Sequence, residues 1–277
     1  MDSENRTIEL DQIGRVLRIT LNRPQRHNPL SPRCIREITS AIADAERDST
    51  VHVIVIRGSG PSFSSGYGVV PGDLSPEEAE TMSRPKSLES DVHDMIGIGR
   101  SWDAVWECSI PVIAQVHGHC LAGGTDLALH CDLVVCANDT TIGFPPVRSM
   151  GVPPTNMWLY HLGPQWTKRL LLTGDTITGE EAARIGLAVE SVPADVLDDH
   201  VLRLASRIAL IGRDLLTANK RVVNEGVELM GRARLERFAA LNDAVAHRSP
   251  EAREFSRRAA EVGLGQAARE RDEPFRT

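Results

Sequence analysis

The chain has 277 residues, of which 41% are hydrophobic and 25% are charged, and its formal net charge is -7. This length predicts one large α/β domain or one and a half domains, and the excess of acidic side chains argues against a nucleic-acid partner. No apolar run reaches the roughly 18 residues of a membrane span, so we expect no membrane partner. The polar start MDSENRTIELDQ lacks the apolar core of a signal peptide, which predicts a cytoplasmic protein.

Two strands and a helix are predicted in the first 56 residues. RVLRITL at residues 15–21 alternates as a strand does. After the proline-rich loop NRPQRHNPLSP, Ser31 and Pro32 indicate a helix N-terminus, and residues 34–47 have helical periodicity. VHVIVI at residues 51–56 is nearly all β-branched, which is typical of a strand buried on both faces.

The loop GSGPSFSSGYGVVPGD follows the second strand, at the kind of strand end where open α/β folds bind ligands. Residues 74–100 are polar, contain two proline breaks and have no strong period. We interpret this stretch as a mobile excursion with helical pieces that could close as a lid. We then predict that residues 101–108 form the end of a helix.

The central stretch IPVIAQVHGHCLAGGTDLALHCDLVVCA, residues 110–137, predicts the unit around which the chain is organised. It contains a buried strand at 110–116, a turn, a pair of glycines, a short helix at 125–130 and a second strand at 132–137. Strand, helix and strand in this order form a compact βαβ-like unit.

The glycines of this unit lie where its helix begins. Gly123 and Gly124 have no side chain, so a ligand can come close to the backbone there. A helix N-terminus also leaves N–H groups unpaired, which favours a group that becomes anionic. Asp126 lies about one turn further on roughly the same face, so a donor and a carboxylate are predicted to point into one space.

Beyond the central unit the sequence predicts mostly helices. Residues 141–152 are interpreted as a short strand and a rigid loop, and residues 189–192 as a last strand. The predicted helices cover residues 156–161, 165–172, 179–185, 194–210, 214–225, 227–246 and 250–262. Only helices follow Pro193, so we divide the chain into a core with the ligand site at 1–193 and a helical region for oligomer packing at 194–277.

Four motifs in order carry a resemblance that extends over nearly the whole chain. They are LNRPQRHNPL, VIVIRGSGPSFSSGYGV, AQVHGHCLAGGTDLALHCDLVVCA and LLLTGDTITGEEAARIGLAVESV. With these motifs the chain resembles the crotonase, or enoyl-CoA hydratase/isomerase, superfamily. The resemblance implies an α/β fold, a crotonase-like spiral of ββα units with a helical C-terminal trimerisation region. It also implies a homotrimer or hexamer that binds an acyl-CoA thioester, with coenzyme A as part of the substrate and no separate cofactor.

The resemblance also implies an oxyanion hole, in which two backbone N–H groups hold the thioester oxygen as it becomes negatively charged. Residue by residue, these donors fall on Tyr67 and Gly123. Arg26 of the same resemblance could reach a CoA phosphate. The implied substrate and CoA site comprises Arg26, Asn28, Pro29, Leu30, Ser65, Gly66, Gly68, Gly124 and Pro146.

The chain departs from the superfamily at its acids. Hydratases of this kind use one carboxylate to prepare the water and another to handle the proton at the α-carbon. The first position corresponds to Asp126, whereas the second corresponds to Pro146, which cannot exchange a proton. Gly68 also stands where aspartate is frequent. Asp126 is therefore the candidate acid or base, and His119 is a second candidate that could replace the lost acid.

The implied function is that of an enoyl-CoA hydratase/isomerase in fatty acid metabolism, and two alternatives stay open. The same oxyanion hole could serve hydrolysis of a thioester or of a C–C bond. The changes at Pro146 and Gly68 favour a catalytically silent acyl-CoA-binding or scaffold protein. We expect residues 69–100 and 150–158 to shape the acyl site.

Other chemistry is not predicted. Five cysteines occur without a C-x-x-C pair, which predicts reduced thiols that pack in the interior. His117 and His119 have no carboxylate or cysteine partner at matching spacing, so we expect no metal. Ser64-Ser65 does not form a G-x-S-x-G elbow and no nucleotide P-loop motif is present, which argues against a serine hydrolase and an NTPase.

Overall fold

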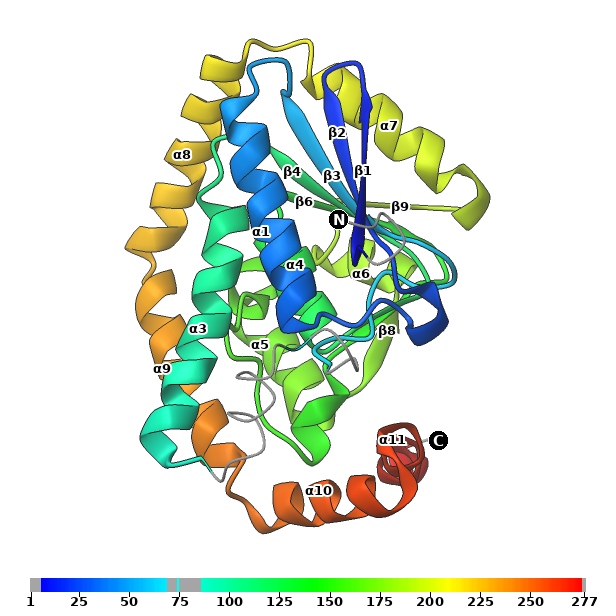
Figure 1. The fold of residues 1–277 in the computed structure, drawn as a ribbon, viewed down its shortest axis with the longest axis vertical. Helices are drawn as coiled ribbons and strands as arrows, with labels where there is room; N and C mark the ends of the chain where they lie inside the picture. Colours follow the sequence, from blue (N-terminus) through cyan, green and yellow to red (C-terminus); the bar gives the residue numbers. More distant parts are fainter. Residues whose placement is uncertain (1–5, 69–73, 75–85, 276–277) are drawn as a thin grey trace.

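A six-stranded sheet forms the centre of the structure (Figure 1). The computed structural model describes residues 6–68, 74 and 86–275. The strand order is β1-β2-β3-β4-β6-β9, and of these pairs only β1 and β2 run antiparallel. The strands are β1 (Ile8–Ile13), β2 (Val16–Leu21), β3 (Val53–Gly58), β4 (Val112–Val116), β6 (Leu133–Ala137) and β9 (Glu190–Val192).

Three short strands form a second sheet in the order β5-β7-β8. The turn His117-Gly118 leads from β4 into β5 (His119–Leu121), which pairs in parallel with β7 (Thr141–Gly143). Strand β8 (Thr176–Thr178) runs antiparallel to β7. The main sheet and the second sheet therefore meet directly before the helix of the central unit.

Helices cover both faces of the main sheet, with α1 (Pro32–Arg47) on one side and α7 (Leu197–Ile208) on the other (Figure 1). The other helices are α3 (Leu88–Trp106), α4 (Gly123–His130), α5 (Trp158–Thr173), α6 (Gly179–Ile185), α8 (Arg213–Leu229), α9 (Arg232–Ala246), α10 (Pro250–Val262) and α11 (Leu264–Asp272). Helix α3 packs against α1, and α10 and α11 lie at the end of the molecule away from α7 (Figure 1).

Strand β3 shows why the sheet is covered on both faces. Val53 and Val55 pack in the same cluster as Val201 of α7, whereas Ile54 and Ile56 belong to the core on the α1 side. Successive side chains of a strand point to opposite faces, so a strand with apolar residues at every position needs a cover on each side. The strand predicted at residues 51–56 is confirmed over Val53–Ile56, which are buried, while β3 begins two residues later than predicted and extends to Gly58.

Helix α1 confirms the start that the sequence predicted. The side chain of Ser31 accepts a hydrogen bond from the N–H of Cys34 at 3.2 Å, and Pro32 occupies the first turn. Cys34, Ile38 and Ile42 follow at helical spacing and are buried. Capping and periodicity together therefore fix this helix.

The stretch at residues 74–100 differs from the prediction. Residues 88–100 belong to one continuous helix, α3, whose N-cap Ser87 accepts a hydrogen bond from the N–H of Ser90 at 3.1 Å. The helical period is weak in the sequence because the buried face of α3 includes Asp91 and Gly99. The prediction of a mobile excursion is therefore wrong for residues 88–100, while residues 69–73 and 75–85 lie outside the described part of the chain.

The C-terminal helices also differ in detail. The helix predicted at 227–246 is interrupted, because Gly231 has a φ of +93° between the end of α8 and the start of α9. Helix α11 was not predicted. Strand β1 was also not predicted, because five of its six residues are exposed and its apolar pattern is correspondingly weak.

The division at Pro193 does not separate two packing units. Leu197 of α7 lies in the cluster beneath the main sheet. The neighbouring carboxylate of Asp198 binds Arg57 of β3 and, at 3.4 Å, Arg18 of β2. The helical region therefore begins as part of the core.

The interior contains neutral thiols. All five cysteines are buried thiols, as the sequence predicts. Burial raises the pKa of the Cys120, Cys131 and Cys136 thiols, which keeps them protonated and poorly reactive. Within the described ranges, no helix combines the length and apolarity needed to cross a bilayer.

Leu197→Ala tests whether α7 belongs to the core. Leu197 is 2% exposed, so the variant should lower the free energy of unfolding, measured in urea. Loss of a buried leucine of this kind costs about 2–5 kcal/mol. Leu210→Ala, at a side chain 81% exposed just beyond α7, is the control and should change the free energy little. Equal stability of the two variants would show that α7 contributes nothing to the core.

Candidate active site

Helix α4 begins at a strained backbone. Ala122, directly before the helix, has φ 50° and ψ -125°, a conformation that favours glycine. Its N–H donates to the carbonyl of Gly143 at 3.0 Å, and its carbonyl accepts from the N–H of Thr125 at 2.9 Å. Strain of this kind costs about 1–3 kcal/mol and persists where the surrounding structure holds it, often at functional sites. It sets the direction in which the N–H of Gly123 leaves the helix.

The loop after β3 reaches this helix start through Gly66. Gly66 has a φ of +99°, and a Cβ there would lie 2.7 Å from the Cβ of Ala122 and 2.9 Å from the nitrogen of Gly123. The next residue, Tyr67, rests its ring on Gly123, where a Cβ would lie 2.6 Å from ring carbons. Glycine at both positions lets two segments distant in sequence touch, so Tyr67 and Gly123, the two donors that the resemblance implies, lie close together.

The two backbone donors are unpaired. In the part of the chain that the structure describes, neither the N–H of Tyr67 nor that of Gly123 donates a hydrogen bond. Their neighbours are paired, since Leu30 donates to the carbonyl of Gly66 at 2.8 Å and Gly68 donates to the carbonyl of Leu30 at 3.4 Å. Two unpaired N–H groups, one of them at a helix N-terminus, form a place suited to a developing negative charge.

A mostly apolar cavity of about 430 Å³, the central cavity, opens beside these donors. Met95, Ile98 and Met150 come from the two stretches expected to shape an acyl site. The lining residues are Ser65, Tyr67, Met95, Ile98, Leu121, Ala122, Phe144, Pro145, Pro146, Met150, Gly151, Val152, Pro154, Asp243, His247, Phe255, Leu264, Ala268, Arg271 and Asp272.

Asp126 does not line the central cavity, because the hydroxyl of Tyr67 closes it off. Its Oδ2 accepts from the Tyr67 hydroxyl at 2.9 Å and its Oδ1 accepts from the Thr155 hydroxyl at 2.8 Å. The Tyr67 hydroxyl in turn accepts from Nε1 of Trp102 at 2.8 Å. Asp126 is only 1% exposed, so the sequence prediction of a carboxylate pointing into the open site is modified: its connection to the cavity runs through Tyr67.

Burial governs the protonation of Asp126 and Tyr67. It raises the pKa of Asp126 to about 7, although the hydrogen bonds from Thr155 and Tyr67 lower it. It also raises the pKa of Tyr67, and the nearby charge of Asp126 acts in the same direction. Tyr67 therefore remains a neutral donor, while Asp126 can gain or lose a proton near neutral pH.

The predicted CoA loop is held internally by Asn28. Its side-chain amide donates to the carbonyls of Ser59 and Ser62 at 2.9 and 2.7 Å, and the residue is buried. Leu30 is buried in the core as well. Arg26 is exposed, and its side chain has no ion pair within the described residues. Of these three predicted contacts, Arg26 has the side chain that can reach a ligand.

Of the other residues predicted for this site, Ser65 lines the central cavity, whereas Gly68, Gly124 and Pro29 allow close packing. A Cβ on Gly68 would lie 3.0 Å from Pro29, and a Cβ on Gly124 would lie 2.9 Å from the carbonyl oxygen of Ser64. Gly68 and Gly124 therefore allow the loop to approach its neighbours, and Pro29 supports that approach.

His119 lies apart from Asp126. It is exposed on β5, its ring centroid is 5.8 Å from that of His27, and it lines a separate groove that also contains Arg148 and Arg169. His117 hydrogen-bonds the carbonyl of Gly60 at 2.9 Å. In the described ranges, no three His, Cys, Asp or Glu side chains are grouped to hold a metal ion.

Two ionisable residues of the cavity wall were not predicted from the sequence. Pro146 lines the central cavity and supplies no acid. Asp243 and His247, from the end of α9, line the same cavity. The sequence prediction assigns this helix to oligomer packing. The available signal, an Asp and a His four residues apart, is weak in a tail with many charged residues.

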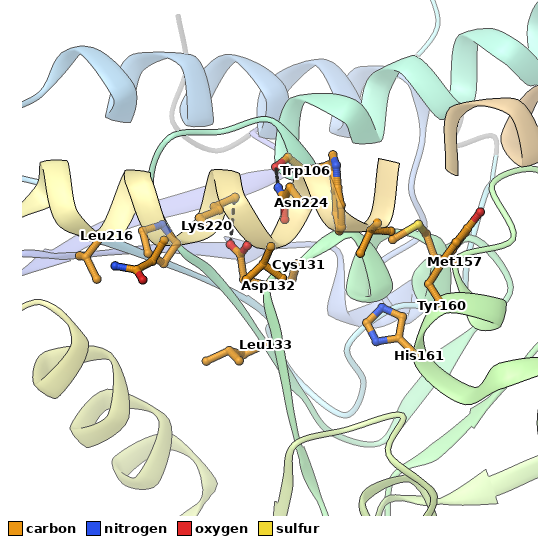
Figure 2. Close-up of a pocket in the computed structure, with 14 residues that line it drawn as sticks. Trp106, Cys131, Asp132, Leu133, Met157, Tyr160, His161, Leu216, Lys220 and Asn224 are labelled. Atoms are coloured by element: carbon orange, nitrogen blue, oxygen red, sulfur yellow. Dashed lines mark hydrogen bonds and ion pairs between the residues drawn. The ribbon is translucent and has the colours of Figure 1, made fainter. Parts of the chain in front are cut away.

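Another cavity, also about 430 Å³, lies beside α8 (Figure 2). Nζ of Lys220 binds Asp132 at 2.8 Å and two backbone carbonyls at 3.2 and 3.3 Å. Asn224 donates to the carbonyl of Trp106 at 2.8 Å. These polar groups are satisfied within the chain, so they attach α8 to the core.

Comparisons with known proteins agree with one another. A family profile described as Enoyl-CoA hydratase/isomerase matches residues 12–254. An enoyl-CoA hydratase structure from Mycobacterium smegmatis superposes with a TM-score of 0.91 at 36% identity, over 99% of this chain and 96% of that chain. The 2,3-dehydroadipyl-CoA hydratase of Escherichia coli strain K12 is 30% identical over 78% of this chain and 80% of its own. The hydroxycinnamoyl-CoA hydratase-lyase of Pseudomonas fluorescens is 28% identical over 73% of this chain and 72% of its own.

Asp126→Asn should change how stability depends on pH. Because burial raises the pKa of Asp126 to about 7, the folded chain keeps this proton where the unfolded chain has lost it. Asp126 therefore lowers stability as pH rises from the unfolded pKa, about 4, to the folded one. Relative to wild type, the variant should gain unfolding free energy between pH 5 and 7, by at most about 1.4 kcal/mol per pH unit, and then level off. Urea unfolding across this range measures it, and a difference independent of pH would contradict the raised pKa.

Proposed function

This chain belongs to the enoyl-CoA hydratase/isomerase family, and from that premise we propose that it stabilises the enolate or a related oxyanion of an acyl-CoA thioester. It is an enzyme of the hydratase/isomerase type with a crotonase-like α/β fold. The specific reaction and the residues that perform it are our proposal. Hydration of a 2-enoyl-CoA is the reaction that we place first, with double-bond isomerisation as its variant.

The observation that supports this proposal most is that the N–H groups of Tyr67 and Gly123 donate no hydrogen bond within the described residues. They come from two adjoining segments, and Tyr67 and Ala122, the residue before Gly123, line the central cavity. Donors fixed before the reaction stabilise charge as it develops on the thioester oxygen, and one such donor can contribute about 2.7–4 kcal/mol. The strained backbone at Ala122 supports this assignment, since it holds the second donor in place.

Asp126 is the proposed acid or base, acting through Tyr67. A proton that arrives at the Tyr67 hydroxyl can be passed on along the 2.9 Å hydrogen bond to Asp126. A pKa of about 7 suits Asp126 to accept and return that proton at neutral pH. His119 is not included in this reaction, because it lies in another groove.

The CoA part is proposed to bind along the loop from Arg26 to Leu30, with the exposed Arg26 contacting a phosphate. Ser65, Gly66, Gly68 and Gly124 shape the approach to the thioester. The acyl chain would occupy the central cavity beside Pro146.

A catalytically silent acyl-CoA-binding protein is the second candidate. It is favoured by the closure of Asp126 behind Tyr67 and by the absence of an acid at Pro146. Hydrolysis of a thioester or C–C bond would use the same two N–H groups. Turnover assays separate these three functions.

A panel of thioesters tests the proposal. Crotonyl-CoA, a longer 2-enoyl-CoA, 2,3-dehydroadipyl-CoA and a hydroxycinnamoyl-CoA should include a substrate whose conjugated absorbance is lost. Release of free CoA instead would indicate thioester hydrolysis. Binding of these thioesters without any turnover would support the silent protein.

Tyr67→Phe and Asp126→Asn should each lower the turnover found in this panel. Both substitutions remove the proton path from the Tyr67 hydroxyl to Asp126 and leave the backbone N–H donors unchanged. General acid–base groups typically contribute about 10²–10⁴-fold to the rate, so we expect a loss of this size. Thr155→Ser is the control, because it keeps a hydroxyl on Asp126. Full activity of Asp126→Asn would exclude Asp126 from the reaction.

We also propose that the chain forms a trimer or a hexamer. The outer faces of α8 and α9 expose apolar side chains, among them Val222 at 74%, Leu229 at 81% and Phe238 at 63%. Such faces are usually covered by another chain. Light scattering at micromolar concentration should therefore give the mass of three or six chains. A monomer would contradict this proposal.

A further inference from the structure

A row of three ionisable side chains runs from α9 to α3 at the wall of the central cavity. Nε2 of His247 lies 3.5 Å from Oδ1 of Asp243. On its other side, Nδ1 of His247 lies 3.2 Å from both carboxylate oxygens of Asp91, which also binds Arg248 at 2.6 Å. Asp243 and His247 line the cavity. The row therefore presents one carboxylate to the cavity and keeps the other behind the imidazole.

The loop that begins at Pro146 holds Asp243 in place. The N–H of Val152 donates to Oδ1 of Asp243 at 2.8 Å. A Cβ on Gly151 would lie 2.0 Å from that same oxygen, so glycine permits the close approach. The N–H groups of Met150 and Gly151 close the loop by donating to the carbonyl of Pro146 at 2.7 and 3.2 Å. The loop with proline in place of an acid thus receives a carboxylate from α9.

Asp243 is close enough to influence the proposed reaction centre. Burial is the main cause of the raised pKa of Asp126 and Tyr67, and the charge of Asp243 adds to both. Burial raises the pKa of Asp243 itself, and Asp91 adds to this, whereas His247 and the N–H of Val152 lower it. The ionisable groups around Asp243 are Asp91 on α3, His247 after α9, Tyr67 and Asp126 across the cavity wall, and Arg271 and Asp272 of α11.

This inference rests on the function proposed above. We infer that Asp243 exchanges a proton with the α-carbon of the bound thioester, in the place where Pro146 provides no acid. His247 is a positioning residue, since it contacts Asp243 on one side and is held by Asp91 on the other. The second acid of this enzyme comes from its C-terminal helices.

The proton and electron balance of hydration then closes. The water oxygen bonds to the β-carbon, and its proton passes through the Tyr67 hydroxyl to Asp126. The C=C electron pair moves to the thioester oxygen, which the N–H groups of Tyr67 and Gly123 stabilise as an enolate. The α-carbon takes a proton from Asp243 as the carbonyl re-forms. Solvent returns a proton to Asp243 and removes one from Asp126, so one water is added per turnover.

The substitution Asp243→Asn tests whether Asp243 exchanges a proton or only packs against the loop at Val152. The amide oxygen of Asn can still accept from the N–H of Val152, but the side chain cannot exchange the proton. Glu236→Gln is the matched control. Glu236 is another carboxylate of α9 whose pKa is raised, to about 7, by burial, and it packs against Gly99 of α3 outside the lining of the central cavity.

Two readouts follow the α-carbon step. One is exchange of the α-protons of butyryl-CoA in D₂O, observed by NMR, and the other is the pH profile of enoyl-CoA turnover. Asp243→Asn should lower exchange and kcat by about 10²–10⁴-fold with KM little changed, and should remove the decline in rate at high pH. His247→Gln should move that decline to higher pH, because His247 lowers the pKa of Asp243. Glu236→Gln should leave exchange, kcat and the decline at high pH as in wild type, because Glu236 does not line the central cavity.

The outcomes are distinguishable. Wild-type exchange and turnover in Asp243→Asn would overturn this inference and leave the proposed function in place. Equal losses in Asp243→Asn and Glu236→Gln would also overturn it, because disturbed helix packing would then explain both. A wild-type protein that neither exchanges nor turns over any thioester of the panel would overturn the proposed function, and this inference with it.

Discussion

The close packing of Gly66 against the start of α4 is the contact on which the site depends. A side chain at Gly66 would overlap Ala122 and the nitrogen of Gly123, so the two segments can meet only without it. Their meeting brings the loop that carries Tyr67 to the nitrogen of Gly123 and positions the Tyr67 ring on the helix start. The strained Ala122 is held by hydrogen bonds on both sides, so the rigid sheet and helix support the strain locally.

Tyr67 joins two parts of the site that the sequence treats separately. Its backbone provides a donor, while its hydroxyl closes off Asp126 and is itself fixed by Trp102. A carboxylate enclosed in this way is poorly solvated when charged, which is why its pKa rises. The same enclosure keeps water from the carboxylate, which is why the proposed proton path runs through the hydroxyl.

The C-terminal helices complete the cavity as well as covering the core. Helix α9 lies against α3, where Gly99 allows Glu236 to approach closely, and Arg232 pairs with Asp103 and Glu236 at 2.9 and 3.0 Å. Buried charges of this kind contribute little net stability, but removing one partner leaves the other unpaired. The Arg232–Asp103 pair crosses from α9 to α3, so it fixes where α9 lies, and with it the side chains that α9 presents to the cavity.

The sequence alone determined the features that depend on local pattern. The apolar strand that the structure places at Val53–Gly58 and the cap at Ser31 were predictable, because periodicity and capping residues act within a few positions. The pairing of Tyr67 with Gly123 was instead implied by the resemblance that four motifs along the chain carry. The tertiary structure decided what depends on contacts across the chain. Asp126 is closed off by a residue 59 positions away, and Asp243 meets Val152 over 91 positions. No local pattern encodes such distances, because they arise only when the sheet, the loops and the C-terminal helices pack together.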